Sequence, residues 1–337
     1  MTPATSASER RGQILLAASR HPLAARFEEG LHRCGDLANG RLALMVSGGG
    51  DSMAMLVLAA AVRERSDPSL DSLAVLAVDH GLRPEARAEC RSALLLAEEL
   101  GIARRACRCV SVASGGNLLE AARIARYEAA RAFEEEHACA AAVAAHTADD
   151  CAESLILSLR RGHGLSALAR ILPLRTFADA SMPTMLRPLL GVRRAALRGF
   201  LEEVGVSWHD DPSNARHERG ELRADPSLAL LVDRIAGGST RLLDEALELL
   251  EFRDQLLASH LAPHATVIAR EEFDRIPKAL QAAALRSLAV AAGGEISHRS
   301  LDRALASLRD RAPRRFACSG GVELTIDARE VRATRAD

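Results

Sequence analysis

Residues 41–162 alternate between short apolar runs and longer segments whose apolar residues recur at helical spacing. This alternation predicts an α/β fold, with a parallel sheet and helices on both of its faces. The predicted strands are 41–46, 73–80, 104–112 and 139–146. The predicted helices are 53–65, 83–100, 116–137 and 148–162. Because ligands of such sheets bind outside the carboxyl ends of the strands, the pattern also indicates where a functional site should lie.

A length of 337 residues suggests two domains. Residues 1–20 are polar and rich in Ala and Ser and predict a loose or helical lead-in, followed by a first domain at 21–225. From 226 to 337 the pattern is mainly helical and closes with a small β element. We find neither a secretory signal nor an apolar run near the roughly 20 residues that a membrane span needs, so we expect a cytoplasmic protein without membrane contact.

Charge and cysteines constrain the partners and the redox state. The net charge is −1, which does not indicate nucleic-acid binding, although a total can conceal a local patch. One such patch is predicted between Arg160 and Phe200, where eight arginines accompany a single acid, Asp179. The seven scattered cysteines predict reduced thiols. Cys107 and Cys109 could suggest a metal site, but a structural zinc site usually has four ligands. We therefore interpret these two cysteines as ordinary residues of the fold.

The sequence SGGGDS at 47–52 joins the first predicted strand to its helix. A glycine-rich turn at this place presents backbone N–H groups, and the positive end of the helix dipole, to an anion. It is neither a Walker motif nor GxGxxG. Asp51 would repel a phosphate unless it binds Mg²⁺. The loop therefore suits a nucleotide whose pyrophosphate leaves with a metal, although a Ser/Gly turn alone can be only a turn.

Two further polar clusters follow predicted strands. Asp79 and His80 follow the second strand, and His146 follows the fourth. Asp150 and Glu153 are spaced i, i+3 and share a helix face, where two carboxylates can hold an ammonium group or help an amine to lose a proton. The alternative is a solvated acidic helix start, which is common because acids favour that end. The neighbouring Asp149 suits a metal or the helix cap.

These motifs together resemble the tRNA(Ile)-lysidine synthetase family of the PP-loop (N-type) ATP pyrophosphatases. The matching segments occur in family order over about 40–225: SGGGDSMAM, VDHGLRPEA, NLLEAARIARYEAA, AHTADDCAESLILSLRRGHGLSAL, LRPLL followed by VRRAALRGFL, and HDDPSN. The DHGLR and DDxxE…RGxG segments are specific to this branch. The resemblance implies a PP-loop catalytic domain at 21–225 and a mainly helical tRNA-binding or substrate domain at 226–337.

The resemblance also implies a reaction. ATP adenylates the carbonyl oxygen of the cytidine at the first anticodon position of tRNA(Ile)(CAU) and releases pyrophosphate. The amine of free L-lysine then attacks the activated ring carbon, AMP leaves, and the product lysidine changes codon reading from AUG to AUA. The enzyme would be an ATP-dependent ligase that forms a carbon–nitrogen bond, with ATP and Mg²⁺ as cofactors. A homodimer is compatible with the sequence, which does not determine the oligomeric state.

Site residues follow from the matching positions. The implied catalytic residues are Asp51, Asp150, Glu153 and His146. The implied ATP or pyrophosphate ligands are Ser47, Gly48, Gly49, Gly50, Asp51, Ser52, Asp79 and His80. Asp150 and Glu153 would bind lysine, and Asp51 would bind Mg²⁺. The implied tRNA ligands are Arg123, Arg126, Arg160, Arg161, Arg193, Arg194, Arg219 and Arg223; for Arg123 and Arg126, solvated helix arginines are the alternative.

The sequence departs from the family at Gly220, where asparagine is expected, so any substrate role of that amide is lost or moved. Two other functions stay open. One is another PP-loop tRNA-modifying enzyme, such as a thiolase or an amide-forming ligase, although the chain lacks the CxxC pairs of sulfur-inserting members. The other is a non-catalytic tRNA-binding relative. At this length we expect the larger C-terminal module of long family members to be absent.

Overall fold

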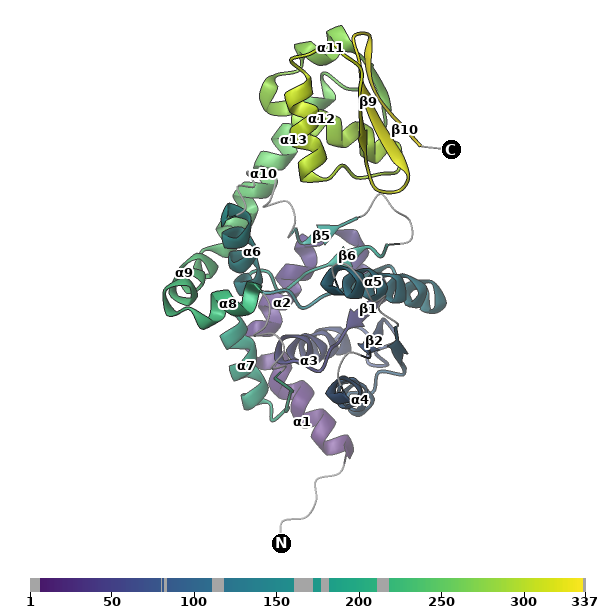
Figure 1. Ribbon diagram of the computed structural model, residues 1–337. Coiled ribbons are helices and arrows are strands. Elements are labelled where there is room, and N and C mark those ends of the chain that lie inside the picture. Colours follow the sequence, from purple (N-terminus) through teal and green to yellow (C-terminus); the bar gives the residue numbers. More distant parts are fainter. Residues whose placement is uncertain are drawn as a thin grey trace. The chain divides into compact units, whose positions relative to one another are not determined.

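The computed structural model describes residues 7–79, 81, 84–110, 118–160, 172–176, 182–210 and 218–335 (Figure 1). The chain forms two compact units. Unit 1 comprises Met1–Thr176 and Ser181–Asp244, and unit 2 comprises Phe177–Ala180 and Glu245–Asp337. This structural boundary lies about one helix beyond residue 225, where the sequence pattern changes.

Unit 1 is built on a six-stranded sheet in the order β3-β2-β1-β4-β6-β5. All neighbouring strands are parallel except β5 and β6, which are antiparallel. The strands are β1 (Leu42–Met45), β2 (Leu73–Asp79), β3 (Arg104–Cys109), β4 (Ala141–Val143), β5 (Leu174–Arg175) and β6 (Met185–Leu186). The predicted α/β class with a parallel sheet is confirmed.

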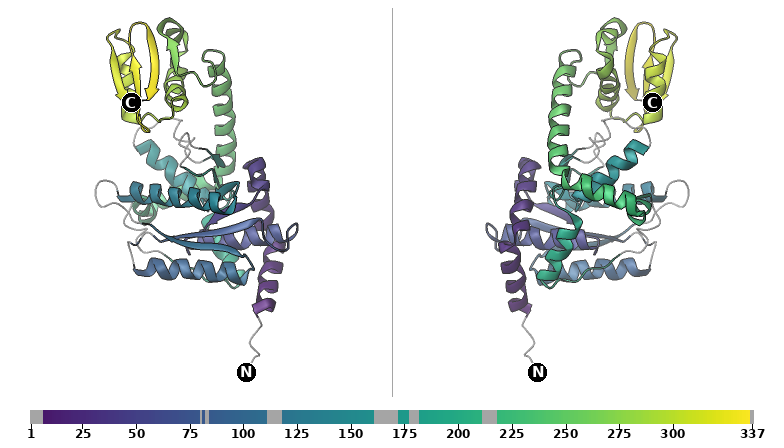
Figure 2. Two further views of the ribbon diagram at one scale, coloured as in Figure 1. Left: turned by 90° about the vertical axis from the view of Figure 1, so that its right-hand side faces the viewer. Right: turned by 90° about the vertical axis from the view of Figure 1, so that its left-hand side faces the viewer.

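Helices cover both faces of this sheet, because each parallel connection crosses from one end of the sheet to the other. Those on one face are α3 (Gly50–Glu64) and α4 (Pro84–Glu99), and α5 (Leu118–His137) lies on the other (Figure 2). The first face is covered again by α1 (Ala7–Arg20), α2 (Pro22–Arg33) and α7 (Arg194–Glu203), which all contact α3. Covered on all sides, α3 is buried from Ser52 to Val62, which explains its unbroken apolar sequence.

Several boundaries differ from the sequence prediction. The fourth strand is only Ala141–Val143 rather than 139–146, because its partner β6 has two residues and the ladder ends there. Neither β5 nor β6 was predicted, since two residues show no periodicity. The segment that follows HDDPSN includes a helix, α8 (Glu218–Ala224), whereas the sequence predicted helices in this part of the chain only from 226 onward; 211–217 lie outside the described residues.

Unit 2 packs helices against an antiparallel sheet with the order β7-β10-β9-β8. The strands are β7 (Val267–Ala269), β8 (Arg314–Ala317), β9 (Val322–Ile326) and β10 (Glu330–Arg335). The helices are α11 (Arg270–Arg275), α12 (Lys278–Ala291) and α13 (His298–Ser307). Phe273, Leu285 and Leu324 are fully buried in its core. The predicted small β element therefore extends to four strands, because β7 joins from a distant part of the chain.

Two helices complete the described elements, α9 (Pro226–Gly237) and α10 (Ser239–Ala258). In unit 1, α9 packs on α6 (Ala148–Arg160) through Val232 and Ala236. No helix among the described residues is both long enough and apolar enough to cross a membrane.

Candidate active site

The loop between β1 and α3 has a backbone conformation that requires glycine at Gly48. Its φ is +84°, and an added Cβ would lie 2.7 Å from the carbonyl oxygen of Glu89 on α4. The loop is closed by Ser52, whose hydroxyl donates to the carbonyl oxygen of Gly49 (2.9 Å) and accepts from the N–H of Ser47 (3.1 Å). The loop therefore has a defined shape without a ligand.

The amino end of α3 faces out of this loop. Its N-cap, Gly49, makes no side-chain capping bond, so the N–H groups of the first turn are available to an anion. Residues 208 and 209, which are distant from the loop in sequence, hold it in place. His209 donates from its N–H to the carbonyl oxygen of Gly48 (3.0 Å), and Trp208 packs against Gly50. Only the structure reveals this support from residues 208–209.

Arg194, at the start of α7, joins three of the predicted site carboxylates. Its Nε donates to Oδ2 of Asp51 (3.1 Å), its Nη2 to Oδ1 of Asp150 (3.0 Å) and its Nη1 to Oε1 of Glu153 (3.2 Å). Asp150 and Glu153 are buried on one face of α6, as their spacing predicts. Three carboxylates that would otherwise repel one another are therefore held together by one guanidinium, whose pKa they raise against the effect of its burial.

Two arginines of α8 reach the same carboxylates. Arg219 donates to Oδ1 of Asp150 (3.2 Å) and to the hydroxyl of Ser154 (2.8 Å). Arg223 binds both oxygens of Glu153, at 2.7 and 3.0 Å. Both contacts form although Gly220 replaces the expected asparagine. Neither α8 nor these pairs were predicted, because ion pairs across about 70 residues leave no local signal in a sequence.

Asp150 also organises its own turn. Its Oδ2 accepts from both the N–H and the hydroxyl of Thr147, each at 2.8 Å. Burial alone would raise the pKa of this carboxyl, but Arg194 and Arg219 outweigh burial and hold it below its ordinary value. Asp150 therefore stays charged in the site.

Asp149 points to α7. Its Oδ2 accepts from the backbone N–H of Arg194 (2.8 Å), which gives that helix the capping bond that Arg193 does not supply. Its carboxylate also binds the guanidinium of Arg193 at 3.3 Å, which in turn pairs with Asp233 on α9 at 2.6 Å. Asp149 thus positions Arg194, rather than capping its own helix as one sequence interpretation had it.

Asp51 has one carboxylate oxygen that does not bind Arg194. Its Oδ1 is buried and has no hydrogen-bond partner within the described part of the chain. Burial raises the pKa of this carboxyl although Arg194 opposes the shift, so Arg194 compensates its charge only in part. An oxygen of this kind is a ligand that Mg²⁺ prefers. Among the described residues there is no cluster of three or more His, Cys, Asp or Glu side chains that could hold a metal by itself.

His146 adjoins a second, basic group of side chains. Burial and the nearby Arg187 lower its pKa to about 3, and its Nδ1 is buried without a partner among the described residues. Arg187 follows β6 and is 3% exposed. The guanidinium carbons of Arg123 and Arg126 on α5 lie 5.2 and 5.9 Å from the ring centre of Tyr127. We call Arg123, Arg126, Arg187 and His146 the basic pocket. Burial lowers the pKa of Arg126, and the neighbouring guanidinium of Arg123 lowers it further.

The other predicted residues have the following positions. Asp79 is buried at the end of β2, where its Oδ1 accepts from the N–H of Gly81 (2.9 Å). Arg160 is exposed at the end of α6. His80 and Arg161 lie outside the described residues. The predicted tRNA ligands Arg193, Arg194, Arg219 and Arg223 all bind carboxylates in this structure.

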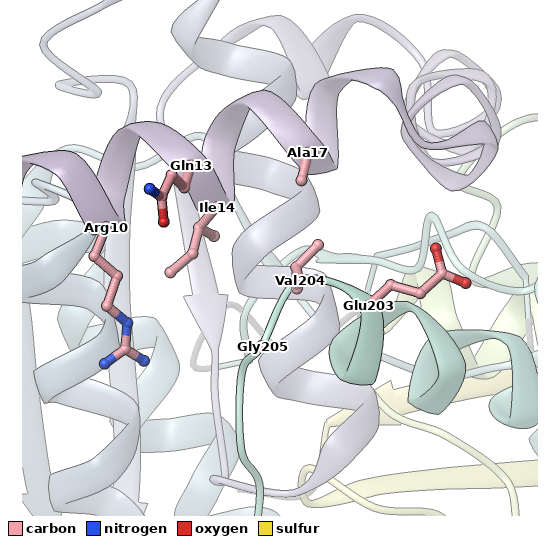
Figure 3. A pocket seen from close by; sticks show the side chains of 7 residues that line it. All are labelled: Arg10, Gln13, Ile14, Ala17, Glu203, Val204 and Gly205. Atoms are coloured by element: carbon pink, nitrogen blue, oxygen red, sulfur yellow. The ribbon is translucent and has the colours of Figure 1, made fainter. Parts of the chain in front are cut away.

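One groove of unit 1 is lined by other residues. It has a volume of about 360 Å³ and lies between α1 and the end of α7, lined by Arg10, Gln13, Ile14, Ala17, Glu203, Val204 and Gly205 (Figure 3). It contains none of the residues of the PP loop or the carboxylate cluster. The candidate active site is therefore defined by converging charges rather than by the size of a cavity.

Comparison with known proteins identifies the family. The family model described as PP-loop domain matches residues 21–225. A tRNA(Ile)-lysidine synthase of Hyphomonas neptunium is 32% identical over 323 residues, which cover 90% of this chain and 84% of the relative. The chain belongs to the tRNA(Ile)-lysidine synthase family. A second member, from Novosphingobium aromaticivorans, is 39% identical over 216 residues, 62% of this chain and 64% of the relative.

Members of the family differ in length from this chain. The chain covers between 44% and 64% of the length of four of the curated synthases that it matches. Among solved structures, the U34-tRNA thiolase NcsA from Methanococcus maripaludis has a TM-score of 0.49 and 17% identity, covering 66% of this chain and 80% of its own. That degree of likeness does not separate one activity from another.

Proposed function

We propose that the chain is an ATP-dependent ligase that converts the first anticodon cytidine of tRNA(Ile)(CAU) to lysidine. The observation that carries this proposal is the bonding of Arg194 to Asp51 on one side and to Asp150 and Glu153 on the other. Pyrophosphate would leave next to Asp51, and lysine would bind next to Asp150. One guanidinium would thus bring the two half-reactions into adjacent space, as adenylation of the carbonyl oxygen and attack on the carbon that bears it require.

The PP loop would bind the phosphates of ATP. Ser47, Ser52 and the amino end of α3 supply the hydrogen-bond donors, and Asp79 and His80 would lie towards the nucleoside. Mg²⁺ bound to the free Oδ1 of Asp51 would neutralise charge on the leaving pyrophosphate. Asp51 itself would orient that ion, while Arg194 keeps its other oxygen in place.

Lysine would enter by displacing arginine side chains. The carboxylates of Asp150 and Glu153 are fully occupied, but the side chains of Arg219 and Arg223 are 40% and 37% exposed, against 18% for Arg194. We therefore expect the two arginines of α8 to give way to the ammonium group and Arg194 to stay. The lowered pKa of Asp150 favours binding of the ammonium over acceptance of its proton.

The tRNA would meet the basic pocket. Arg126 and Arg187 have no carboxylate partner within the described residues, and His146 presents an unpartnered nitrogen next to them. Backbone phosphates on either side of the flipped cytidine are the anions that such a pocket suits. Arg160 is exposed and adds to this surface, whereas tRNA contacts from Arg193, Arg194, Arg219 or Arg223 would need them to leave their carboxylates. Such an enzyme would act in the cytoplasm, where its tRNA substrate is found.

The test is incorporation of labelled lysine into an isoleucine tRNA transcript with a CAU anticodon, with ATP and Mg²⁺. A methionine tRNA transcript and the variant Asp51→Ala are the controls. We expect incorporation only into the isoleucine transcript and none with the variant. Absence of lysine incorporation combined with tRNA-dependent AMP formation would overturn the proposal, and would favour another PP-loop enzyme, such as a thiolase.

A further inference from the structure

The basic pocket gathers positive charge without a carboxylate to balance it. The guanidinium groups of Arg123, Arg126 and Arg187 lie at the ring or at the hydroxyl of Tyr127. Among the described residues, neither Arg126 nor Arg187 has a carboxylate partner. Like charges in a buried place repel one another strongly, because little water screens them. Some other group must therefore keep these arginines together.

Tyr127 has the position and the contacts to do this. It is 6% exposed on α5, and its hydroxyl is hydrogen-bonded to the side chains of Arg123 and Arg187. A guanidinium group can only donate, so the phenol oxygen is the acceptor in both bonds. Arg123 lies one turn before Tyr127 on the same helix. Arg187 follows β6, so one oxygen atom joins two separate elements of unit 1.

Arg187 is also held by the backbone of a neighbouring segment. Its N–H donates to the carbonyl oxygen of Pro173 (2.8 Å), and its Nη1 donates to that of Leu172 (2.9 Å). With backbone acceptors as well as Tyr127, the guanidinium has a fixed position. That position matters for the site, because the charge of Arg187 acts on His146, whose pKa is lowered by burial and then by Arg187.

The ionisation of Tyr127 agrees with these contacts. Burial alone would raise the pKa of its phenol, but Arg123 and Arg187 outweigh burial and lower it. A phenol oxygen with more negative character is a stronger acceptor for a guanidinium group. An aromatic residue that only filled space in the core would show the effect of burial alone.

We propose that Tyr127 is a positioning residue of the active site: its hydroxyl oxygen holds Arg123 and Arg187 in the arrangement with which the basic pocket receives a phosphate group. The proposal rests on the proposed function, which takes that phosphate from the backbone of the tRNA. Tyr127 acts through the two arginines rather than on the substrate. A guanidinium group that is already oriented loses less freedom when the phosphate arrives, so a fixed arrangement binds more tightly.

The test compares three variants of the full chain. Tyr127→Phe removes the hydroxyl and keeps the ring on which Arg123 and Arg126 lie. Tyr127→Leu removes the ring as well. Phe133→Leu is the matched control: Phe133 is fully buried on the same helix, where its ring packs on that of His137 with 4.3 Å between the centroids. Thermal melting establishes that the variants remain folded.

Binding of the isoleucine transcript is measured without ATP or lysine. We expect Tyr127→Phe to bind at least about tenfold more weakly than the parent, the effect of losing one hydrogen bond to a charged group. Tyr127→Leu should bind no better, because the hydroxyl is lost in both, and Phe133→Leu should keep the parent affinity. Parent affinity in Tyr127→Phe, including a loss confined to Tyr127→Leu, would overturn the proposal.

A second measurement reports on the hydroxyl itself. Tyr127 is the only tyrosine of the chain, so the ultraviolet absorbance of tyrosinate follows its ionisation alone. In the folded parent we expect ionisation below the ordinary pKa of about 10. Arg187→Gln should raise the pKa of Tyr127, since less positive charge then opposes burial. Ionisation of the parent at or above the ordinary value would overturn the proposal, because the two guanidinium groups would then not face the oxygen.

Lysine incorporation separates this inference from the proposed function. We expect Tyr127→Phe to show a raised KM for tRNA and an unchanged affinity for ATP. If the parent incorporates lysine and Tyr127→Phe has the same kcat/KM for tRNA, the inference fails and the proposed function stands. If the parent incorporates no lysine but binds the transcript more tightly than Tyr127→Phe does, the proposed function fails and the positioning role stands.

Discussion

Arg194 and Asp51 are joined by a 3.1 Å hydrogen bond that spans 143 residues of sequence. The bond links the amino end of α7 to the first turn of α3, so the position of one helix depends on the other. It also fixes which oxygen of Asp51 remains free. The geometry of the pyrophosphate loop and that of the carboxylate cluster are therefore not independent.

We expect Arg194→Ala to abolish lysine incorporation and to lower stability. Removal of the guanidinium leaves Asp150 and Glu153 buried with fewer partners, which costs about 2–4 kcal/mol of the free energy of unfolding. kcat/KM for lysine should fall at least about a hundredfold, the usual effect of removing one aligned charge from an active site. Steady-state kinetics and urea unfolding measure the two effects.

Arg198→Ala is the control for this variant, because Arg198 lies one turn further along α7 and its ion pair is with the exposed Asp210. Arg194→Lys should recover stability better than activity, since one ammonium cannot bind three carboxylates in the fixed geometry of a guanidinium. Full activity of Arg194→Ala would contradict the role assigned to the Arg194–Asp51 bond.

Gly48→Ala should weaken ATP binding at least about tenfold and destabilise unit 1. The left-handed φ of +84° costs a residue with a Cβ about 1–2 kcal/mol, and the Cβ would also meet the carbonyl oxygen of Glu89 at 2.7 Å. Gly205→Ala separates the two causes, because Gly205 has a φ of +69° and no atom within 4 Å of its added Cβ. A calorimetric titration with ATP should show normal binding for Gly205→Ala. Weak ATP binding by Gly205→Ala as well would refute the steric explanation.

Stability should decrease as pH rises, because of Glu134 on α5. This carboxyl is 2% exposed, and burial raises its pKa to about 7 against the partial compensation from Arg131. Between the unfolded pKa of about 4.5 and the folded value, the native state binds the extra proton, so stability is lost as pH rises through that window. Glu134→Gln should therefore gain up to about 3 kcal/mol at pH 8 and less than about 1 kcal/mol at pH 5.

Urea unfolding monitored through Trp208, the single tryptophan of the chain, reports on the unit that contains Glu134. Glu128→Gln, an exposed change on the same helix, should leave the stability equal at both pH values. A gain from Glu134→Gln that is the same at pH 5 and pH 8 would show that the buried charge is not its source.

His146 should not contribute an ionisation to the pH profile of the free enzyme near neutrality. Burial and Arg187 lower its pKa to about 3, so we expect the ring to be neutral near pH 7. kcat/KM for tRNA reports groups of the free enzyme. His146→Gln should therefore lower kcat/KM by the same factor between about pH 5.5 and 7.5. If kcat/KM of the parent protein changed with pH in this range and the change disappeared in His146→Gln, the imidazole would be shown to ionise in this range.

The sequence predicted the parts of the molecule that leave a local or periodic signal. Four strands, their order of alternation with helices, and the glycine loop were all visible, because a buried parallel strand is apolar throughout and Gly48 must be glycine. The shared face of Asp150 and Glu153 followed from helix geometry alone.

What the sequence did not predict depends on contacts between distant segments. The two-residue strands β5 and β6 are stabilised by neighbouring strands rather than by their own pattern. The arginine partners of Asp150 and Glu153 lie 41 to 70 residues away along the chain. A sequence shows that these three arginines exist but not which carboxylates they meet, and so all three were assigned to tRNA on the resemblance alone.

The bond between His209 and Gly48 has a consequence for how ATP binding should be measured. A loop fastened to its neighbour has already lost its conformational freedom during folding, so a nucleotide need not order it. Binding should then produce little change in heat capacity and little added protection of the amides of 47–52 from exchange with solvent deuterium. The nucleotide loop would then have the same conformation with and without ATP. Conformational change on substrate binding would be confined to α8, whose arginines must move.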